Sequence, residues 1–154
     1  MLRRSGAEAA SGAAGPRAGC LRTGMSKALW RKLGYRRGMV ACLDEAPEHY
    51  RALLRGLPQD VRLDGTLDDR PKLIHHFTTE AEGLRARLAV FKDVIPKTGA
   101  IWISWPKKAS GVPTDMSGDA VRAAALPLGL VDVKVCRIDE TWTALKLVIR
   151  KEDR

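Results

Sequence analysis

The chain has 154 residues, of which 45% are hydrophobic and 29% are charged. This composition suits one globular domain and argues against a largely disordered chain. No apolar run approaches the roughly 20 residues that a membrane-spanning helix needs, so we expect no membrane partner. The formal net charge is +9, and the part from Met25 onward carries about +6 of it, which is enough to attract nucleic acid or anionic metabolites weakly. Nucleic-acid binding is less favoured, because no dense Lys/Arg run with interleaved aromatic residues occurs.

The segment 1–24 is rich in Ala, Gly and Arg and has no periodic apolar pattern. It predicts a disordered leader, followed by a single domain over 25–154. An Arg-rich, acid-poor leader is also typical of an organellar transit peptide. We prefer a simpler interpretation, in which translation starts at Met25, because the ordered pattern begins there.

The cysteines, Cys20, Cys42 and Cys136, are odd in number and form no C-x-x-C motif. Two of them lie in apolar stretches, where a free thiol behaves as a small hydrophobic side chain. This pattern indicates a reducing, cytoplasmic location rather than a disulfide framework. Because no Cys, His or acidic group stands at metal-ligand spacing, we expect no metal site.

The ordered pattern opens with a short helix and a strand. Ser26 can cap a helix over 27–33, and Gly34 is placed to end it. The apolar run 38–43 predicts a buried strand. A second helix is predicted over 47–57, with its proline in the first turn.

Two more strands and a longer helix are predicted in the middle of the chain. The strand over 61–63 is weak, and the strand over 72–77 is stronger. Thr78 or Thr79 can cap the following helix, with Glu82 completing a capping box from Thr79. The apolar stripe of that helix consists of Leu84, Leu88 and Phe91.

The last third of the chain has the clearest strand signals. The run 100–105 is nearly apolar throughout, as expected of a central parallel strand covered on both faces. Ser117 can cap a helix that extends to about Leu126. The segment 130–138 alternates valines with polar residues and predicts a half-exposed strand. A short turn then leads into an antiparallel strand over 142–149.

This order of elements predicts an α/β fold: a Rossmann-like three-layer open sheet, mostly parallel, with an antiparallel C-terminal hairpin. In such sheets ligands bind beyond the carboxyl ends of the parallel strands. Polar and aromatic residues follow those ends, so we expect the binding surface there. The candidate ligand-binding residues are Asp44, His76, Trp105, Lys107, Lys108, Ser110, Asp139, Glu140, Thr141 and Trp142.

The segment 105–111 has the most site-like chemistry. Lys107 and Lys108 offer cationic donors and Ser110 a hydroxyl, ahead of a capped helix whose N-terminus favours anions. A solvated charged loop is an equally good interpretation of the same residues. Trp105 ends a strand and is the best aromatic candidate for contacting a ligand.

Other polar and aromatic residues fit structural roles first. His75 and His76 alternate across their strand, so one of them is expected to be a core histidine. The pair 139–140 suits a hairpin turn before it suits an acid catalyst. Trp102 and Trp142 fit the core better than a stacking platform for a ligand.

The turn after the first strand, residues 43–48, lacks the glycines that let a backbone approach phosphate or methionine in dinucleotide and S-adenosylmethionine folds. Carboxylates and a proline stand there instead, and they would repel a pyrophosphate. Asp64 lies where these folds place a ribose-binding acid, which is weak evidence alone. We therefore expect no cofactor, with S-adenosylmethionine as the alternative.

Four stretches, 32–39, 103–112, 125–136 and 139–146, resemble a bacterial family of short proteins. Its domain is labelled as a domain of unknown function, number three thousand and fifty-two. The most specific strings are W-P-K-K-x-S-G-V and D-E-T-W. The resemblance covers about residues 26–150 and implies a fold similar to a trimmed class I methyltransferase core. It supplies no catalytic residue.

Three functions from different classes remain open. The first is a binding protein that takes a small anionic ligand or a protein segment at the carboxyl edge, and we favour it over catalysis because no complete catalytic constellation is visible. The second is a degenerate S-adenosylmethionine-dependent methyltransferase-like protein. The third is a nucleic-acid-associated accessory protein, whose affinity would fall steeply with salt.

Overall fold

The structure is a computed structural model that describes residues 28–154. The predicted leader, the start at Met25 and the Ser26 cap lie outside the described residues. A short helix nevertheless begins close to its predicted place, and Gly34 ends it in the left-handed conformation with φ 92°. Glycine adopts this conformation at little cost, as the sequence predicted.

A five-stranded mixed sheet forms the middle layer, with strand order β1-β2-β3-β5-β4. The first three strands run parallel to one another, and β5 pairs antiparallel with both β3 and β4. The predicted α/β Rossmann-like sheet with a C-terminal hairpin is therefore confirmed. The strands are β1 (Ala41–Asp44), β2 (Leu73–Phe77), β3 (Ala100–Pro106), β4 (Leu130–Arg137) and β5 (Trp142–Ile149).

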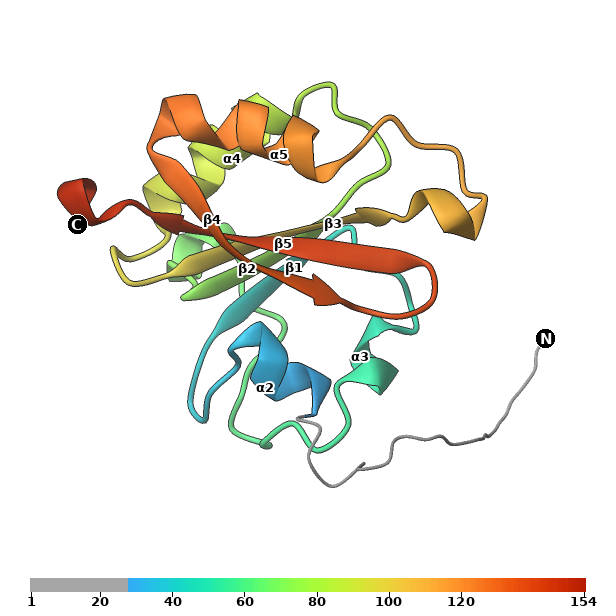
Figure 1. Cartoon of the computed structure of the whole chain (residues 1–154). Coiled ribbons are helices and arrows are strands. Elements are labelled where there is room, and N and C mark those ends of the chain that lie inside the picture. Colours follow the sequence, from blue (N-terminus) through green and yellow to red (C-terminus); the bar gives the residue numbers. More distant parts are fainter. Residues whose placement is uncertain (1–27) are drawn as a thin grey trace.

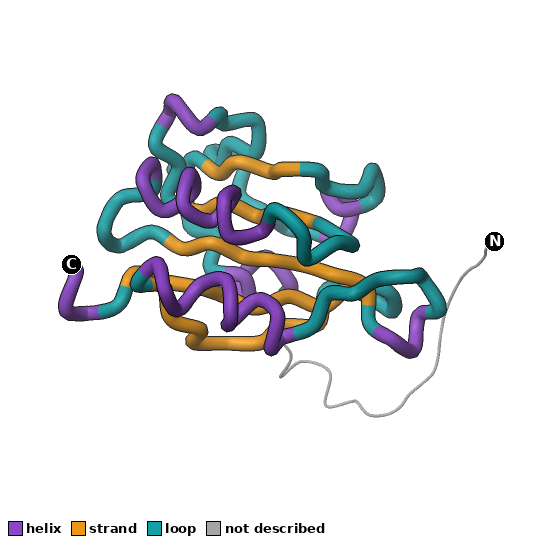
Figure 2. The backbone as a smooth tube through the Cα atoms, turned by 90° about the horizontal axis from the view of Figure 1, so that it is seen from above, coloured by secondary structure: helices purple, strands orange, loops and turns teal. Residues whose placement is uncertain are grey.

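Helices cover both faces of the sheet and complete the three layers (Figure 1). The helices α2 and α3 lie on one face, and α4 and α5 lie side by side on the other, as the view from above also indicates (Figure 2). The α-helices are α2 (Leu29–Leu33), α3 (Tyr50–Leu53), α4 (Leu84–Val94) and α5 (Gly118–Ala125). Short 3-10 helices occur at Leu67–Asp69, Lys108–Ser110, Leu126–Leu128 and Lys151–Asp153.

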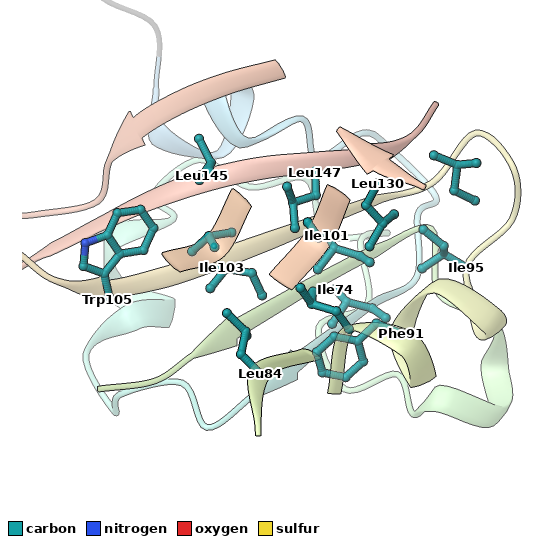
Figure 3. Packing of buried hydrophobic residues seen from close by; sticks show 14 of the residues in the cluster. Ile74, Leu84, Phe91, Ile95, Ile101, Ile103, Trp105, Leu130, Leu145 and Leu147 are labelled. Carbon is teal, nitrogen blue, oxygen red and sulfur yellow. The ribbon is translucent and has the colours of Figure 1, made fainter. Parts of the chain in front are cut away.

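The core consists of two apolar clusters, one on each face of the sheet. Side chains alternate along a strand, so neighbouring residues of β3 serve different clusters. Ile101 and Ile103 pack with Leu84 and Phe91 of α4 (Figure 3). Trp102 belongs to the other cluster, beneath α2 and α3. The predicted stripe of α4 is confirmed, since Leu84, Leu88 and Phe91 are all buried.

Two predicted elements are wrong in extent. The helix predicted over 47–57 is the four-residue α3, because Leu54 leaves the helical region with ψ 40° and a turn follows. The strand predicted over 61–63 is reduced to a single parallel bridge between Val40 and Arg62. The chain turns back directly afterwards, where the N–H of Gly65 donates to the carbonyl of Ala41 at 3.0 Å.

Details at the ends and edges of elements also differ. Ser117 caps α5 as predicted, accepting from the N–H of Ala120. No threonine caps α4, which begins after Gly83, because Thr78 instead accepts from the N–H of Glu80 in a local turn. The strand predicted as half-exposed over 130–138 forms as β4, in which Val133 and Val135 are 54% and 61% exposed. The strand lies at the sheet edge and carries a register shift at this point.

Candidate functional site

The two segments with the most distinctive chemistry meet at one rim of the sheet. Pro106, at the end of β3, pairs with Trp142 at the start of β5. One residue further, the backbone N–H of Lys107 donates to the carbonyl of Thr141 at 2.8 Å. The end of β3 and the β4–β5 turn accordingly lie on the same side of the molecule (Figure 1). The topology predicted this meeting at the carboxyl edge.

The loop after β3 is held in shape by its own serine. The hydroxyl of Ser110 donates to the carbonyl of Lys107 at 2.6 Å and accepts from the N–H of Val112 at 3.2 Å. Ser110 is therefore committed to the loop, although the sequence placed it among the ligand-binding candidates. Lys107 is half-buried and Lys108 is exposed, and neither forms an ion pair within residues 28–154.

Trp105 lies in the core rather than at the surface of this rim. It is only 8% exposed and packs in the cluster beneath α4 and α5 (Figure 3). Its ring therefore presents little area to a ligand, which corrects the expectation that it is the best aromatic contact. Trp142 packs edge to face against Phe77, with ring centroids 5.2 Å apart.

Asp139 shapes the hairpin turn. Its Oδ1 accepts from the backbone N–H groups of Thr141 and Trp142, at 2.9 and 2.7 Å. Its Oδ2 lies 2.8 Å from Nε2 of His49, which ties the turn to the start of α3. Glu140 is exposed beside it. The carboxylate of Asp139 thus has a structural role, and no sequence pattern indicated its contact with His49.

A second polar cluster lies where β1 and β2 end. Oδ2 of Asp44 is 2.6 Å from Nδ1 of His76, and the guanidinium of Arg87 donates to the same oxygen. Burial lowers the pKa of His76, and the nearby carboxylate of Asp44 opposes that shift. The sequence predicted Asp44 and His76 at this edge but missed Arg87, which comes from the first half of α4.

A shallow hollow opens beside this cluster, and its lining is rich in carboxylates. Glu45, Glu80 and Glu82 line it together with His76 and Arg87. A positively charged group would be favoured there, because the acidic side chains outnumber the cationic ones. The carboxyl edge therefore offers an acidic hollow at the ends of β1 and β2 and a basic loop at the end of β3.

His75 faces away from that hollow and lies in a buried chain of hydrogen bonds. Its Nδ1 is 2.8 Å from the hydroxyl of Tyr50, which in turn is 2.9 Å from the hydroxyl of Tyr35. Its Nε2 is 2.5 Å from Oγ of Ser104. Complete burial lowers the pKa of His75 to about 3, and burial raises the pKa of both tyrosines. The expectation that one histidine of the pair belongs to the core is confirmed.

The turn after β1 does not fit the cradle that an S-adenosylmethionine fold uses. Residues 44–48 contain no glycine, and Glu45 itself adopts the left-handed conformation with φ 60°. A side chain stands where bare backbone would be needed, so we derive no methyl-transfer step. The structure adds no support for Asp64 as a ribose-binding acid, because its side chain is 74% exposed and forms an ion pair with Arg62.

Metal-ligand clusters and membrane-spanning helices are both absent from the part of the chain that the structure describes. Between residues 28 and 154, no group of three or more His, Cys, Asp and Glu side chains could hold a metal ion. Within the same range, every helix is too short or too polar to cross a membrane.

The fold is that of Rossmann-like methyltransferases. A putative type 11 methyltransferase from Sulfolobus solfataricus is similar with a TM-score of 0.57 and 11% identity, over 80% of this chain and 90% of that one. An O-methyltransferase of neocarzinostatin biosynthesis (NcsB1), solved with S-adenosylmethionine and 2-hydroxy-5-methyl naphthoic acid, has a TM-score of 0.51 and 12% identity. That match covers 79% of this chain and 50% of the neighbour. At such identities the likeness establishes the fold alone.

No protein-family model matches the sequence, and no curated protein matches it.

Proposed function

We propose that this protein binds a small anionic ligand at the carboxyl edge of its sheet, through the loop that carries Lys107 and Lys108. The observation that supports the proposal is the hydrogen bond from the N–H of Lys107 to the carbonyl of Thr141, which fixes the loop against the hairpin. The lysines follow a buried strand directly, so their backbone is positioned before a ligand arrives. Preorganisation of this kind lowers the entropic cost of binding.

The charges of the loop favour an anion over a neutral ligand. Lys107 and Lys108 have no ion-pair partner among the described residues. The half-buried position of Lys107 strengthens its interaction with an anion, because screening by water is weaker there than on an open surface. An acidic segment of a partner protein is the alternative occupant of the same loop.

Replacing both loop lysines with alanine tests the proposal. We expect at least one compound in a thermal-shift panel of carboxylates and phosphates to stabilise the native protein and to lose that effect in Lys107→Ala/Lys108→Ala. A ligand at about 100 times its Kd stabilises a protein by about 3 kcal/mol, which such an assay detects readily. Lys151→Ala, an exposed lysine after β5, is the matched control. Equal ligand shifts in the native protein and the double variant would contradict the proposal.

A second candidate function is binding of S-adenosylmethionine without the glycine cradle. The acidic hollow beside Asp44 favours it, since this ligand carries a sulfonium and an ammonium, and so does the fold of methyltransferases. The ligand would supply an activated methyl group when bound. Its contacts here would come from carboxylates such as Glu45 rather than from backbone alone.

Calorimetric titration with S-adenosylmethionine tests this candidate. If it is correct, the native protein gives a saturable heat at about 1 mM ligand or below. Glu45→Gln should then weaken binding, because the neutral amide keeps the volume and loses the charge. Glu48→Gln, an exposed neighbour outside the lining of the hollow, should bind as the native protein does. Silence of the native protein at that concentration removes the candidate.

A further inference from the structure

A second hollow lies at the opposite end of the sheet from the carboxyl edge. It forms where β2 and β3 begin, and its volume is about 480 Å³. Leu73 and Ala100, at the starts of these strands, line it together with Leu33 and Gly34 from the end of α2. None of the candidate residues at the carboxyl edge contributes to it.

The charged residues of this hollow are all cationic. Arg36 and Arg37 come from the loop after α2, Lys72 precedes β2, and Lys146 comes from β5. Lys134 of β4 lies opposite Lys146 in the register of the hairpin, and it adds a further positive charge nearby. Three parts of the chain that are distant in the sequence thus bring their cations to one hollow, and Lys134 lies beside it.

Carboxylates are scarce around these cations. Arg37 pairs with Asp60 at 3.5 Å, on the exposed side of the loop. Within residues 28–154, Arg36, Lys72 and Lys146 form no ion pair. The ammonium of Lys134 donates only to the carbonyl of Lys32, at 3.0 Å. The fold therefore gathers like charges without neutralising them.

Among these cations, Lys146 has surroundings that are unfavourable for its charge. It is half-buried, with Nζ 3.7 Å from the point where a Cβ on Gly34 would lie. Burial, together with the charges of Lys134 and Arg36, lowers the pKa of Lys146. A bound anion would reverse the unfavourable charge interactions, because opposite charges at short distance stabilise the ionised form.

The loop that borders the hollow also has free donors. Its course depends on Gly38, at φ 76°. Within the described residues, the backbone N–H groups of Arg36, Arg37 and Gly38 have no hydrogen-bond acceptor. Backbone N–H groups beside arginine and lysine side chains are a common arrangement for holding phosphate oxygens.

We propose that this amino-edge hollow binds the phosphate of a small organic phosphate, with Arg36, Lys72 and Lys146 as its cationic contacts. A phosphate dianion suits several convergent cations better than a single carboxylate does, and a guanidinium can bind it in a bidentate manner. The apolar lining from Leu33 and Leu73 offers space for the organic part. A concave site favours a small molecule over the backbone of a nucleic acid, which needs an extended basic surface.

This site is independent of the function proposed for the carboxyl edge. Titration calorimetry with inorganic pyrophosphate and with AMP, at constant ionic strength, tests it directly. We expect saturable binding of both probes by the native protein. Lys146→Met keeps the aliphatic stem and removes the charge, so it should weaken binding about tenfold or more, as expected for losing a hydrogen-bonded charge.

Further variants guard against a folding defect and separate the two sites. Arg36→Gln changes an exposed loop residue that the core does not need, and it should weaken binding similarly. Lys151→Ala, which changes an exposed lysine outside both proposed sites, should bind pyrophosphate as the native protein does. The proposal would be overturned if the native protein does not bind the probes, or if Lys146→Met and Arg36→Gln both bind them as tightly as the native protein does.

A single-stranded DNA oligonucleotide tests whether the hollow binds the phosphates of a nucleic acid rather than the phosphate of a small molecule. We expect it to bind more weakly than AMP, because a concave site accommodates a small molecule more readily than an extended chain. Tight, salt-sensitive DNA binding that Lys146→Met abolishes would replace the small-molecule site with a nucleic-acid surface. Loss of pyrophosphate binding in the double variant at the carboxyl edge would instead move the phosphate site to that edge.

Discussion

Acidification from about pH 7 to about pH 4 should lower the free energy of unfolding by several kcal/mol, because His75 must stay neutral in the folded protein. Its pKa is about 3 in the fold, against an ordinary value of 6.5 for an exposed histidine. Between these values the unfolded chain binds a proton that the folded chain does not. Stability therefore falls as the pH drops below about 6.5, by about 1 kcal/mol for each pH unit from this group. His76, whose pKa is also lowered by burial, acts in the same direction.

The surroundings of His75 explain why it resists a proton. Both ring nitrogens already have neutral hydroxyl partners, Tyr50 on one side and Ser104 on the other. No carboxylate among the described residues pairs with this ring, and His76 opposes the charge. A neutral ring donates from one nitrogen and accepts at the other. The hydrogen bonds that join Tyr35, Tyr50, His75 and Ser104 must therefore all run in the same direction through this series.

Urea unfolding at a series of pH values measures this effect. The native protein should lose stability steadily below about pH 6.5, with an unchanged m-value. His75→Gln keeps a donor and an acceptor without a titrating group, so its profile should be flatter. His49→Gln removes a surface imidazole and serves as the control. Because the core variant can fail to fold, the ring resonances of the native protein give a second test: a His75 that titrates in the folded state as an exposed histidine does refutes the prediction.

The sequence predicted best where one strong pattern decided the structure. The run around Trp102 and Ile103 is apolar at nearly every position, and it forms the central β3, in which every residue is buried. The short turn at Asp139 allows only a hairpin, and the antiparallel pair follows. Prediction failed where elements are too short for a period to show. The residues around Arg62 make only isolated bridges, and α3 is a single turn held by packing of Tyr50.

Part of the site also followed from topology alone. Lys107 and Thr141 meet because the ends of neighbouring strands must share an edge. The burial of Trp105 did not follow from the sequence. Alternation along a strand decides on which face of the sheet a side chain lies, but it does not say which helix covers that face. Arg87 reaches Asp44 from a helix that is distant in the sequence, and no local pattern marks it. The amino-edge hollow depends on three separate parts of the chain, so only the packed fold brings its cations together.

Trp102→Ala should remove about 3–5 kcal/mol from the free energy of unfolding, a large share of the about 5–15 kcal/mol typical of a domain. Trp102 is completely buried and lies in the central strand. Its truncation leaves a cavity that the flanking strands are too constrained to fill. Its indole N–H also donates to the carbonyl of Leu33 at 2.7 Å, so the side chain fastens the end of α2 to the sheet.

Trp102→Phe tests how much the hydrogen bond to Leu33 contributes to stability when an aromatic side chain is kept at this position. It retains an aromatic ring but leaves the buried carbonyl of Leu33 without its donor, which should cost about 1–3 kcal/mol. Because Leu33 and Gly34 line the amino-edge hollow, release of this contact should also weaken pyrophosphate binding. Urea unfolding of both variants beside Trp142→Ala, a half-buried tryptophan, measures the effect. A loss at Trp102→Ala no larger than at Trp142→Ala would show that this residue does not anchor α2 to the sheet.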